Sequence, residues 1–223
     1  MITGGAEEMH FMDAGIFDVM RATSTRYNDT PEQTPRPFDR LRDGLVVGEG
    51  SGCLILEEYE RAKKRGATIH AEIIGFGNNC DGGHITNPSS EGMAGAMRLA
   101  LKDAGIAPEA VGHVHAHATA TELGDIAEAR ATCDVFGQRV PVSAVKGYMG
   151  HTLGACGAIE SAVTILMLKE GFMVPTRNLD EPDPACAPLN HVTGGIREER
   201  FDVGMNNNFA FGGINTSLLF CRV

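Results

Sequence analysis

Apolar residues recur along this chain in two patterns, one typical of strands and the other typical of helices. Short apolar runs bounded by turn residues predict strands, and apolar residues three and four positions apart predict helices. Between residues 71 and 170 the patterns alternate, with strands expected over 71–77, 111–116 and 141–144 and helices over 93–104 and about 125–136. Such alternation favours an α/β domain with a mainly parallel sheet.

The segments on either side of this region predict further elements. They are a strand tail over 1–7, a short helix over 13–22, a strand over 45–56, a helix over 57–65 and closing strands over 201–209 and 215–221. The closing strands flank Phe211-Gly212-Gly213, and this glycine-containing turn predicts that they pair antiparallel.

The segment Ser143–Lys169 has the most unusual pattern in the chain. After Lys146 and His151 it contains one charged residue, Glu160, before its end. A helix that is apolar nearly all round must be packed on several sides. If this helix begins near Gly150, His151 lies in its first turn, where the helix dipole disfavours an imidazolium. A neutral imidazole there can donate a hydrogen bond to a developing oxyanion; a histidine that only caps the helix is the alternative.

Composition narrows the class of protein. The chain has 223 residues, of which 43% are hydrophobic, and a net charge of -10, so a nucleic-acid-binding protein is not expected. Its six cysteines are scattered without CxxC spacing, and Glu7 and Glu8 follow the start without a basic segment. We therefore expect reduced thiols and a cytoplasmic protein. No apolar run is long enough to span a membrane.

Three alternating histidines, His113, His115 and His117, allow two interpretations. On a strand, residues two apart point the same way, so the three could bind zinc with Asp125 or Glu128 and form a metal-dependent hydrolase.

The second interpretation places His117 at the carboxyl end of a strand, where α/β proteins bind ligands. The hydroxyls of Thr119 and Thr121 follow it and could hold an amide-containing arm.

Several motifs together resemble the β-ketoacyl-acyl-carrier-protein synthases. They are Ala116-His117-Ala118-Thr119-Ala120-Thr121 with Asp125 and Glu128, Lys146 with Gly150-His151 and Gly154-Ala155-Cys156-Gly157-Ala158, Asn208-Phe209-Ala210-Phe211-Gly212-Gly213-Ile214-Asn215, and RDGLVVGEGSGCLILEEY over 42–59. The motifs occur in the order typical of the family. The resemblance implies a thiolase-like fold of five layers, αβαβα, built from two similar halves. Residues 1–67 would be the tail of the N-terminal half and residues 68–223 the C-terminal half.

The resemblance also implies a reaction. An acyl chain is held as a thioester on a cysteine, malonyl on a carrier protein is decarboxylated, and the resulting enolate attacks the thioester. His117 and His151 would stabilise the enolate oxygen, and Lys146, paired with Glu128, would orient them. No resident cofactor is implied, since phosphopantetheine arrives on the carrier protein.

Further site residues are implied by the same resemblance. Phe211, with Phe209 and Gly212, would form a gate and one arm of an oxyanion hole. The segment Asp81–Pro88, including His84, would form a second gating loop. Thr119 and Thr121 would hold the pantetheine arm, and Arg21 would contact the acidic carrier protein. The full-length family members are expected to be homodimers.

The chain departs from the family pattern in one large respect. The family's nucleophilic cysteine lies upstream of the strand that ends in Gly4-Gly5, so we expect this chain to lack it and to be inactive alone. Cys156 stands where the family usually has alanine. A non-catalytic partner subunit of the chain-length-factor kind is therefore the alternative.

Smaller departures surround the expected substrate tunnel. The family usually has other residues where this chain has His115, Ala118, Ala120, Ala210 and Ile214. We expect these changes to alter substrate choice before they affect the fold.

Overall fold

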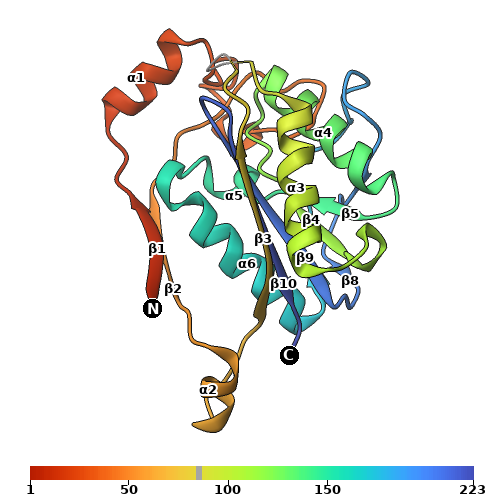
Figure 1. Ribbon diagram of the computed structural model, residues 1–223. Helices are drawn as coiled ribbons and strands as arrows, with labels where there is room; N and C mark the ends of the chain where they lie inside the picture. The colour runs from red at the N-terminus through yellow and green to blue at the C-terminus, as the bar shows by residue number, and fades with distance from the viewer. Residues whose placement is uncertain (84–86) are drawn as a thin grey trace.

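The structure is a computed structural model, and it describes residues 1–83 and 87–223. A six-stranded sheet forms its centre, in the order β3-β10-β9-β4-β5-β7 (Figure 1). Its strands are β3 (Glu72–Cys80), β4 (His113–His115), β5 (Pro141–Ser143), β7 (Asn190–His191), β9 (Val203–Ala210) and β10 (Ile214–Cys221). The other strands are β1 (Ile2–Glu7), β2 (Gly50–Ile55), β6 (Phe172–Met173) and β8 (Arg197–Glu198). The α-helices are α1 (Phe11–Val19), α2 (Tyr59–Lys64), α3 (Ser90–Ala104), α4 (Glu122–Phe136), α5 (Lys146–Met149) and α6 (Cys156–Glu170).

The central sheet is mixed. Strands β9, β4, β5 and β7 pair in parallel, as the alternating pattern predicts, whereas β10 pairs antiparallel with both β9 and β3. The predicted antiparallel pairing of the closing strands is confirmed. Parallel strands place the loops that follow β4 and β5 at the same edge of the sheet, and these loops lead to His117 and Lys146.

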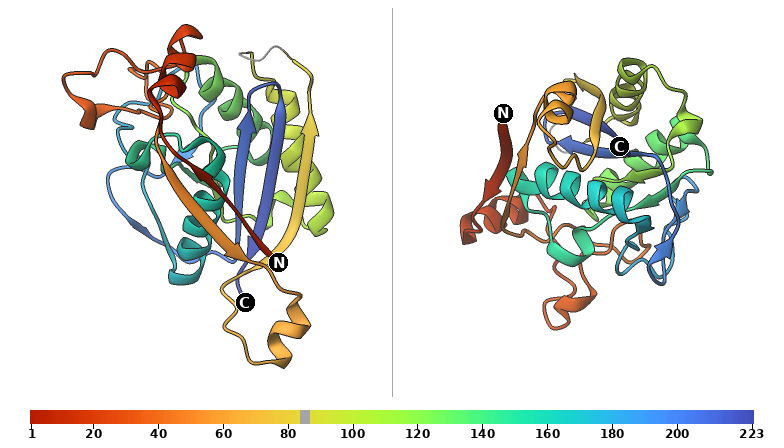
Figure 2. Two further views of the ribbon diagram at one scale, coloured as in Figure 1. Left: turned by 90° about the vertical axis from the view of Figure 1, so that its left-hand side faces the viewer. Right: turned by 90° about the horizontal axis from the view of Figure 1, so that it is seen from below.

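The elements stack in four layers. Helices α3 and α4 cover one face of the central sheet, and α6 covers the other; the antiparallel ribbon β1-β2 packs on the far side of α6 (Figures 1 and 2). The expected arrangement of helices between sheets is therefore confirmed in an αβαβ order. Among the residues that the structure describes, no helix has both the length and the apolar character needed to cross a membrane.

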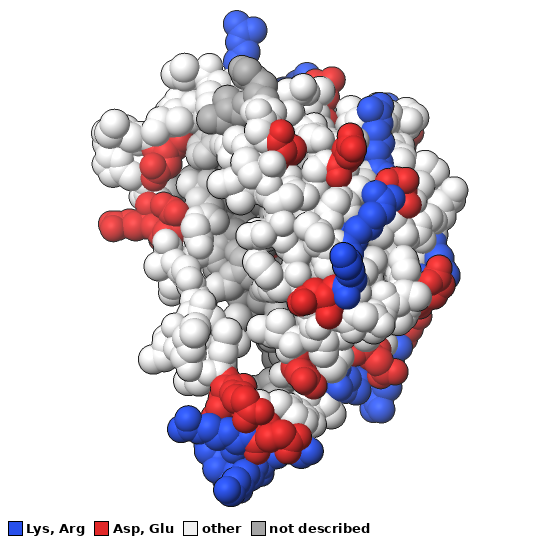
Figure 3. Space-filling view, in the orientation of Figure 1, with Lys and Arg blue, Asp and Glu red and all other residues white. Residues whose placement is uncertain are grey.

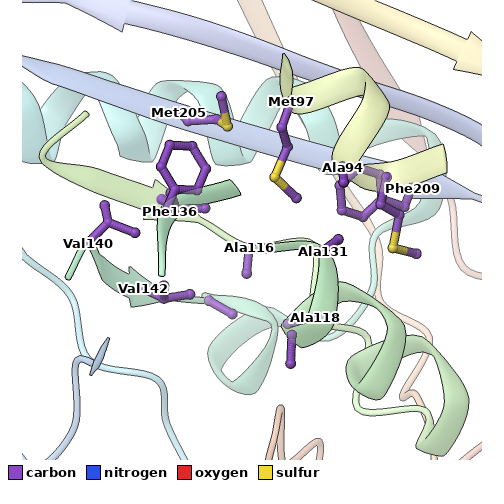
Figure 4. Packing of buried hydrophobic residues seen from close by; sticks show 14 of the residues in the cluster. Ala94, Met97, Ala116, Ala118, Ala131, Phe136, Val140, Val142, Met205 and Phe209 are labelled. Carbon is purple, nitrogen blue, oxygen red and sulfur yellow. The ribbon is translucent and has the colours of Figure 1, made fainter. Parts of the chain in front are cut away.

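The main core lies between the sheet and the pair α3 and α4. Met97 of α3 and Met205 of β9 are fully buried there, close to Phe136, Val140 and Ala116 (Figure 4). Local signals fix the ends of α3: Ser89 caps its first turn and Gly105, in the left-handed conformation, ends it.

Helix α2 projects from the body at the end of the β1-β2 ribbon (Figures 1 and 2). Acidic and basic side chains are mixed over it (Figure 3). Arg61 and Arg65 both pair with Glu57, and Lys63 pairs with Glu60. Basic residues in and just after α2 are therefore paired with acidic residues in or just before it, in keeping with a solvated helix.

Two expectations about the segment after Lys146 are wrong. Helix α6 begins at Cys156, and His151 lies before it in extended backbone that bridges Val47. The left-handed conformations of Gly150 and Leu153 prevent one helix from running through this segment.

Helix α6 is also not buried all round. Its buried side carries the polar residues Glu160, Ser161 and Thr164, whereas Leu166 is 51% exposed. Polar groups face the sheet because they meet hydrogen-bonding partners from β4 and β9 there, such as His115.

Candidate active site

The fold brings His117 and His151 together. His117 follows β4, and His151 lies between α5 and α6, yet their ring centroids are 5.1 Å apart and the rings are nearly perpendicular. Burial and the charge of Lys146 lower the pKa of His117 well below its usual value and that of His151 to about 3. Both imidazoles are therefore neutral, as expected, but the cause is burial beside a cation and not the dipole of a helix.

Hydrogen bonds determine which nitrogen of each imidazole carries the proton. The backbone N–H of Leu153 donates to Nδ1 of His151 over 3.2 Å. Nδ1 of His117 faces two donors, Nζ of Lys146 at 3.3 Å and Nδ2 of Asn208 at 3.5 Å. Because each Nδ1 accepts, the proton of each neutral ring is on Nε2. The site thus presents two imidazole N–H donors.

Lys146 is fully buried and forms an ion pair with Glu160, with Nζ 2.5 Å from Oε1. Its ammonium group also donates to the carbonyl oxygen of His117. Burial by itself would lower the pKa of Lys146, but the surrounding acidic groups, chiefly Glu160, together raise it. The expected pairing of Lys146 with Glu128 is wrong, because Glu128 is engaged by backbone groups.

Glu128 of α4 holds the loop that carries His117. Its Oε1 accepts the backbone N–H of His117 over 2.8 Å, and its Oε2 accepts that of Ala118 over 2.6 Å. Burial raises the pKa of Glu128, but the two backbone N–H donors oppose the shift and favour the ionised carboxylate. Glu128 therefore positions His117 through the backbone.

Asp125, one turn earlier on α4, holds the same loop at Ala120 and fixes a second loop at Phe38. Its Oδ1 accepts the backbone N–H of Ala120 over 3.0 Å, and its Oδ2 accepts that of Phe38 over 2.7 Å. Arg42 lies 3.7 Å from the same carboxylate. Burial raises the pKa of Asp125 to about 6 although Arg42 opposes the shift.

The predicted gate lies at the turn between β9 and β10. Phe211 is 41% exposed and its ring is 5.5 Å from that of Phe17 in α1. Phe209 is buried, with its ring 6.3 Å from that of His117. Gly212 has a φ of +82°, a conformation that side chains disfavour, so a glycine suits the turn.

Asp81 is joined to the same turn. Its backbone N–H donates to the carbonyl oxygen of Gly213, and its carboxylate accepts from Nδ2 of Asn215 over 3.0 Å. The two predicted gating segments therefore contact each other. The predicted gate residue His84 lies outside the described residues.

The residues expected to bind the arm and the carrier protein lie on the surface side of the site. Oγ1 of Thr119 and Oγ1 of Thr121 are 2.9 Å apart, and both residues are partly exposed. Arg21 follows α1 and is exposed. Their roles stay predictions.

The three alternating histidines do not form a metal site. Nε2 of His113 meets Oγ of Ser143, Nδ1 of His115 meets Oγ1 of Thr164, and His117 lies beyond the end of β4 and faces His151. Strand alternation therefore does not extend to the third histidine. Within residues 1–83 and 87–223, the one group of potential ligands that comes together is His117, Cys156 and Glu160. The ammonium of Lys146 already binds two of these residues.

Three residues at the site were missed: Glu160, Asn208 and Cys156. Nδ2 of Asn208 donates to Oε2 of Glu160 over 2.7 Å, which completes the ion pair with Lys146. A signal for Glu160 existed, because a lone carboxylate within an apolar helix requires a buried cation, and Lys146 precedes that helix. Asn208 and Cys156 lie within the motifs of the family resemblance, but no pattern in the sequence assigned a role to either residue.

Comparison with known proteins agrees with this geometry. Two family models match, "Beta-ketoacyl synthase, N-terminal domain" over residues 1–62 and "Beta-ketoacyl synthase, C-terminal domain" over residues 70–180. The 3-oxoacyl-[acyl-carrier-protein] synthase 2 of Coxiella burnetii is 46% identical, and the match covers 100% of this chain and 55% of that protein. The 3-oxoacyl-[acyl-carrier-protein] synthase 1 of Escherichia coli K12 is 41% identical, and the match covers 100% of this chain and 54% of that protein.

Solved structures extend the similarity to three dimensions. A crystal structure of a beta-ketoacyl synthase from Burkholderia phymatum has a TM-score of 0.98 and 58% identity, covering 100% of this chain and 54% of that one. A second similar structure is that of a type II PKS acyl-carrier protein in complex with its ketosynthase bound to the hexaketide. It has a TM-score of 0.95 and 34% identity, and the match covers 100% of this chain and 56% of that one. The chain spans about half the length of the curated relatives it matches.

Proposed function

The chain belongs to the β-ketoacyl synthase family, and on that premise we propose that it supplies the His117, His151 and Lys146 part of a site for decarboxylative Claisen condensation. The substrates would be an acyl thioester and malonyl on an acyl carrier protein, in fatty-acid or polyketide synthesis. The observation that carries the proposal is the pair of neutral imidazoles beside the buried ion pair of Lys146 and Glu160.

The proposed reaction has two steps. The bond between the malonyl carboxyl carbon and its α-carbon breaks, carbon dioxide leaves, and the electron pair passes to the thioester oxygen as an enolate. The enolate carbon then attacks the acyl thioester, so a carbon–carbon bond forms and the thiol that held the acyl chain leaves. Phosphopantetheine on the carrier protein brings the malonyl group, so the proposal requires no resident cofactor.

The imidazoles would act on the enolate. A neutral ring with its proton on Nε2 can donate to an oxygen that gains negative charge, and two such donors stabilise it without first losing a proton of their own. The ammonium of Lys146 lowers the pKa of both rings, so it favours the neutral state that donation requires. Lys146 also donates to the carbonyl oxygen of His117 and thereby fixes that ring's position.

A non-catalytic partner subunit is the second candidate for this chain. Such a subunit has no chemical need for a fully buried lysine and two neutral imidazoles, and burying an ion pair costs desolvation energy. The intact arrangement around Lys146 therefore favours the catalytic candidate.

The acyl carrier protein is the proposed partner. A similar structure contains a carrier protein with its ketosynthase, and in this chain Arg21, which follows α1, offers an exposed cation. We propose that the hydroxyls of Thr119 and Thr121, which lie 2.9 Å apart, hold the amides of the arm. We propose a homodimer for the full-length enzyme by analogy with the family.

The test is release of carbon dioxide from malonyl-carrier protein by the full-length enzyme, since this step uses the imidazoles directly and this chain alone is expected to be inactive. His117→Ala and His151→Ala are each expected to reduce release roughly 100- to 1000-fold, as for loss of an oxyanion donor. His70→Ala, at an exposed histidine, is the control and should leave the rate unchanged. A wild-type protein no faster than its His117→Ala variant would overturn the proposal.

A further inference from the structure

The thiol of Cys156 lies inside the site, although the proposed chemistry does not use it. Cys156 is the first residue of α6 and is 3% exposed. Its Sγ is 3.4 Å from Nδ1 of His151 and 3.6 Å from Oε1 of Glu160. The thiol therefore stands between an imidazole and the carboxylate that holds Lys146.

The polarity of these contacts makes Cys156 a donor. Nδ1 of His151 accepts the backbone N–H of Leu153, so it presents a lone pair, and the Glu160 carboxylate has only lone pairs to offer. A thiolate would add a negative charge against both acceptors. Burial raises the pKa of the Cys156 thiol although the charge of Lys146 opposes the shift, so the sulfur keeps its proton.

We propose that Cys156 is a positioning residue, whose single S–H proton is shared between His151 and Glu160 and helps to keep the proton of His151 on Nε2. The inference rests on the proposed function, since Nε2–H is the donor that an enolate would meet. It deepens that function by adding a residue that acts through His151.

A single S–H donor can affect the position of the proton because the two forms of a neutral imidazole, Nδ1–H and Nε2–H, differ little in free energy. Which nitrogen carries the proton is decided by the hydrogen bonds of the other nitrogen. In this site, donors from Leu153 and Cys156 both point at Nδ1, so both oppose a proton there. Loss of the thiol leaves the Leu153 donor alone at Nδ1, while His117 still packs against the ring.

The test measures the proton's position on His151 in the full chain without substrate, from the 15N chemical shifts of its ring nitrogens. Cys156→Ala is expected to increase the ratio of Nδ1–H to Nε2–H forms roughly two- to fivefold, the effect of one weak hydrogen bond. Cys156→Ser is expected to give an intermediate ratio, because a hydroxyl also donates but is shorter. Cys186→Ala, at a buried thiol of the main core, is the matched control.

An unchanged ratio in Cys156→Ala overturns the inference, and so does an equal change in Cys186→Ala. If Cys156→Ala does not fold, the same measurement is made on Cys156→Ser. A ratio of Nδ1–H to Nε2–H forms equal to that of the wild type would then overturn the inference, because the hydroxyl is too short to replace the thiol fully. Because the spectra need no substrate, a shifted ratio together with no release of carbon dioxide by the full-length enzyme would refute the proposed function and leave this inference standing.

Discussion

Asp125 and Glu128 lie three residues apart on α4, and between them their carboxylates bind the backbone N–H groups of Phe38, Ala118 and Ala120. These three residues have φ angles of +63°, +36° and +64°, which residues with a side chain rarely adopt. Left-handed backbone costs energy in a non-glycine residue, so a surrounding structure must hold it. The two carboxylates supply that restraint on loops that carry or border the site.

Replacing Glu128 with glutamine should therefore destabilise the protein. One of the two carboxylate oxygens becomes an NH2 group, which cannot accept from the N–H of His117 or Ala118. We expect the free energy of unfolding to fall by about 1–3 kcal/mol, the cost of an unsatisfied buried group. Urea denaturation measures it, with Glu122→Gln at the exposed start of α4 as control. Equal stability of the two variants would contradict the prediction.

Ala118→Gly should have the opposite effect. Glycine adopts a positive φ without a steric penalty, so relief of strain at φ +36° is expected to add on the order of 1 kcal/mol to the stability. Ala116→Gly, two residues earlier and at a negative φ, is the control and should be destabilising. Thermal or urea unfolding measures both changes in stability, an increase for Ala118→Gly and a decrease for Ala116→Gly.

The same substitution tests whether these alanines affect substrate choice. A full-length enzyme carrying Ala118→Gly and Ala210→Gly is expected to show an altered preference for acyl chains, because both positions border the expected tunnel. Competition between acyl thioesters of different length is the measurement. The same preference in wild type and variant would count against the role of these residues.

The ion pair of Lys146 and Glu160 predicts a strongly non-additive double substitution. Lys146→Met leaves a buried carboxylate without its cation and should cost about 3–5 kcal/mol of stability. Lys146→Met combined with Glu160→Gln removes both charges, so much of that stability should return. Release of carbon dioxide should stay low in both proteins, because the ammonium is absent. A double variant as unstable as Lys146→Met would show that the two charges are not coupled.

His113 predicts loss of stability in acid. Burial lowers its pKa from an ordinary value of 6.5 to about 3, so the unfolded chain binds a proton that the folded protein does not bind. The contribution of His113 to stability is therefore complete above pH 6.5 and is lost as the pH falls towards 3, by about 1.4 kcal/mol per pH unit.

The matching measurement is urea denaturation at several pH values between 7.5 and 4.5. His113→Gln should reduce the slope of the unfolding free energy against pH by the amount that corresponds to about one bound proton. His70→Gln, at an exposed site, should leave that slope unchanged. Parallel curves for wild type and His113→Gln would show that this histidine is not held in its neutral form.

Helix α3 illustrates what pattern and local signals could predict. The spacing of Met93, Met97 and Leu101 predicted one buried face, and Gly105 predicted the end. In the structure the helix begins earlier than predicted, at Ser90, and ends at Ala104 as predicted. Spacing and caps depend on residues within one or two turns of each other, so they are present in the sequence itself.

His151 illustrates where local reasoning failed. The apolar run after it indicated a helix from Gly150, but Gly150 and Leu153 adopt positive φ and a backbone bridge to Val47 holds the segment extended. The bridge partner lies about a hundred residues earlier, so no local pattern could predict it.

The alternation of strands and helices could be predicted from the sequence, because periodicity is a property of the chain. The thiolase-like class and the joint action of His117 and His151 were implied by the resemblance of the motifs to a known family. Which carboxylate pairs with Lys146 was decided by the tertiary structure. Glu128 and Glu160 are both acidic residues in helices within 20 positions of Lys146, and only folding turns one towards backbone N–H groups and the other towards the ammonium. A buried charge is stabilised by the partners within a few ångströms of it, and these are set by how the layers pack.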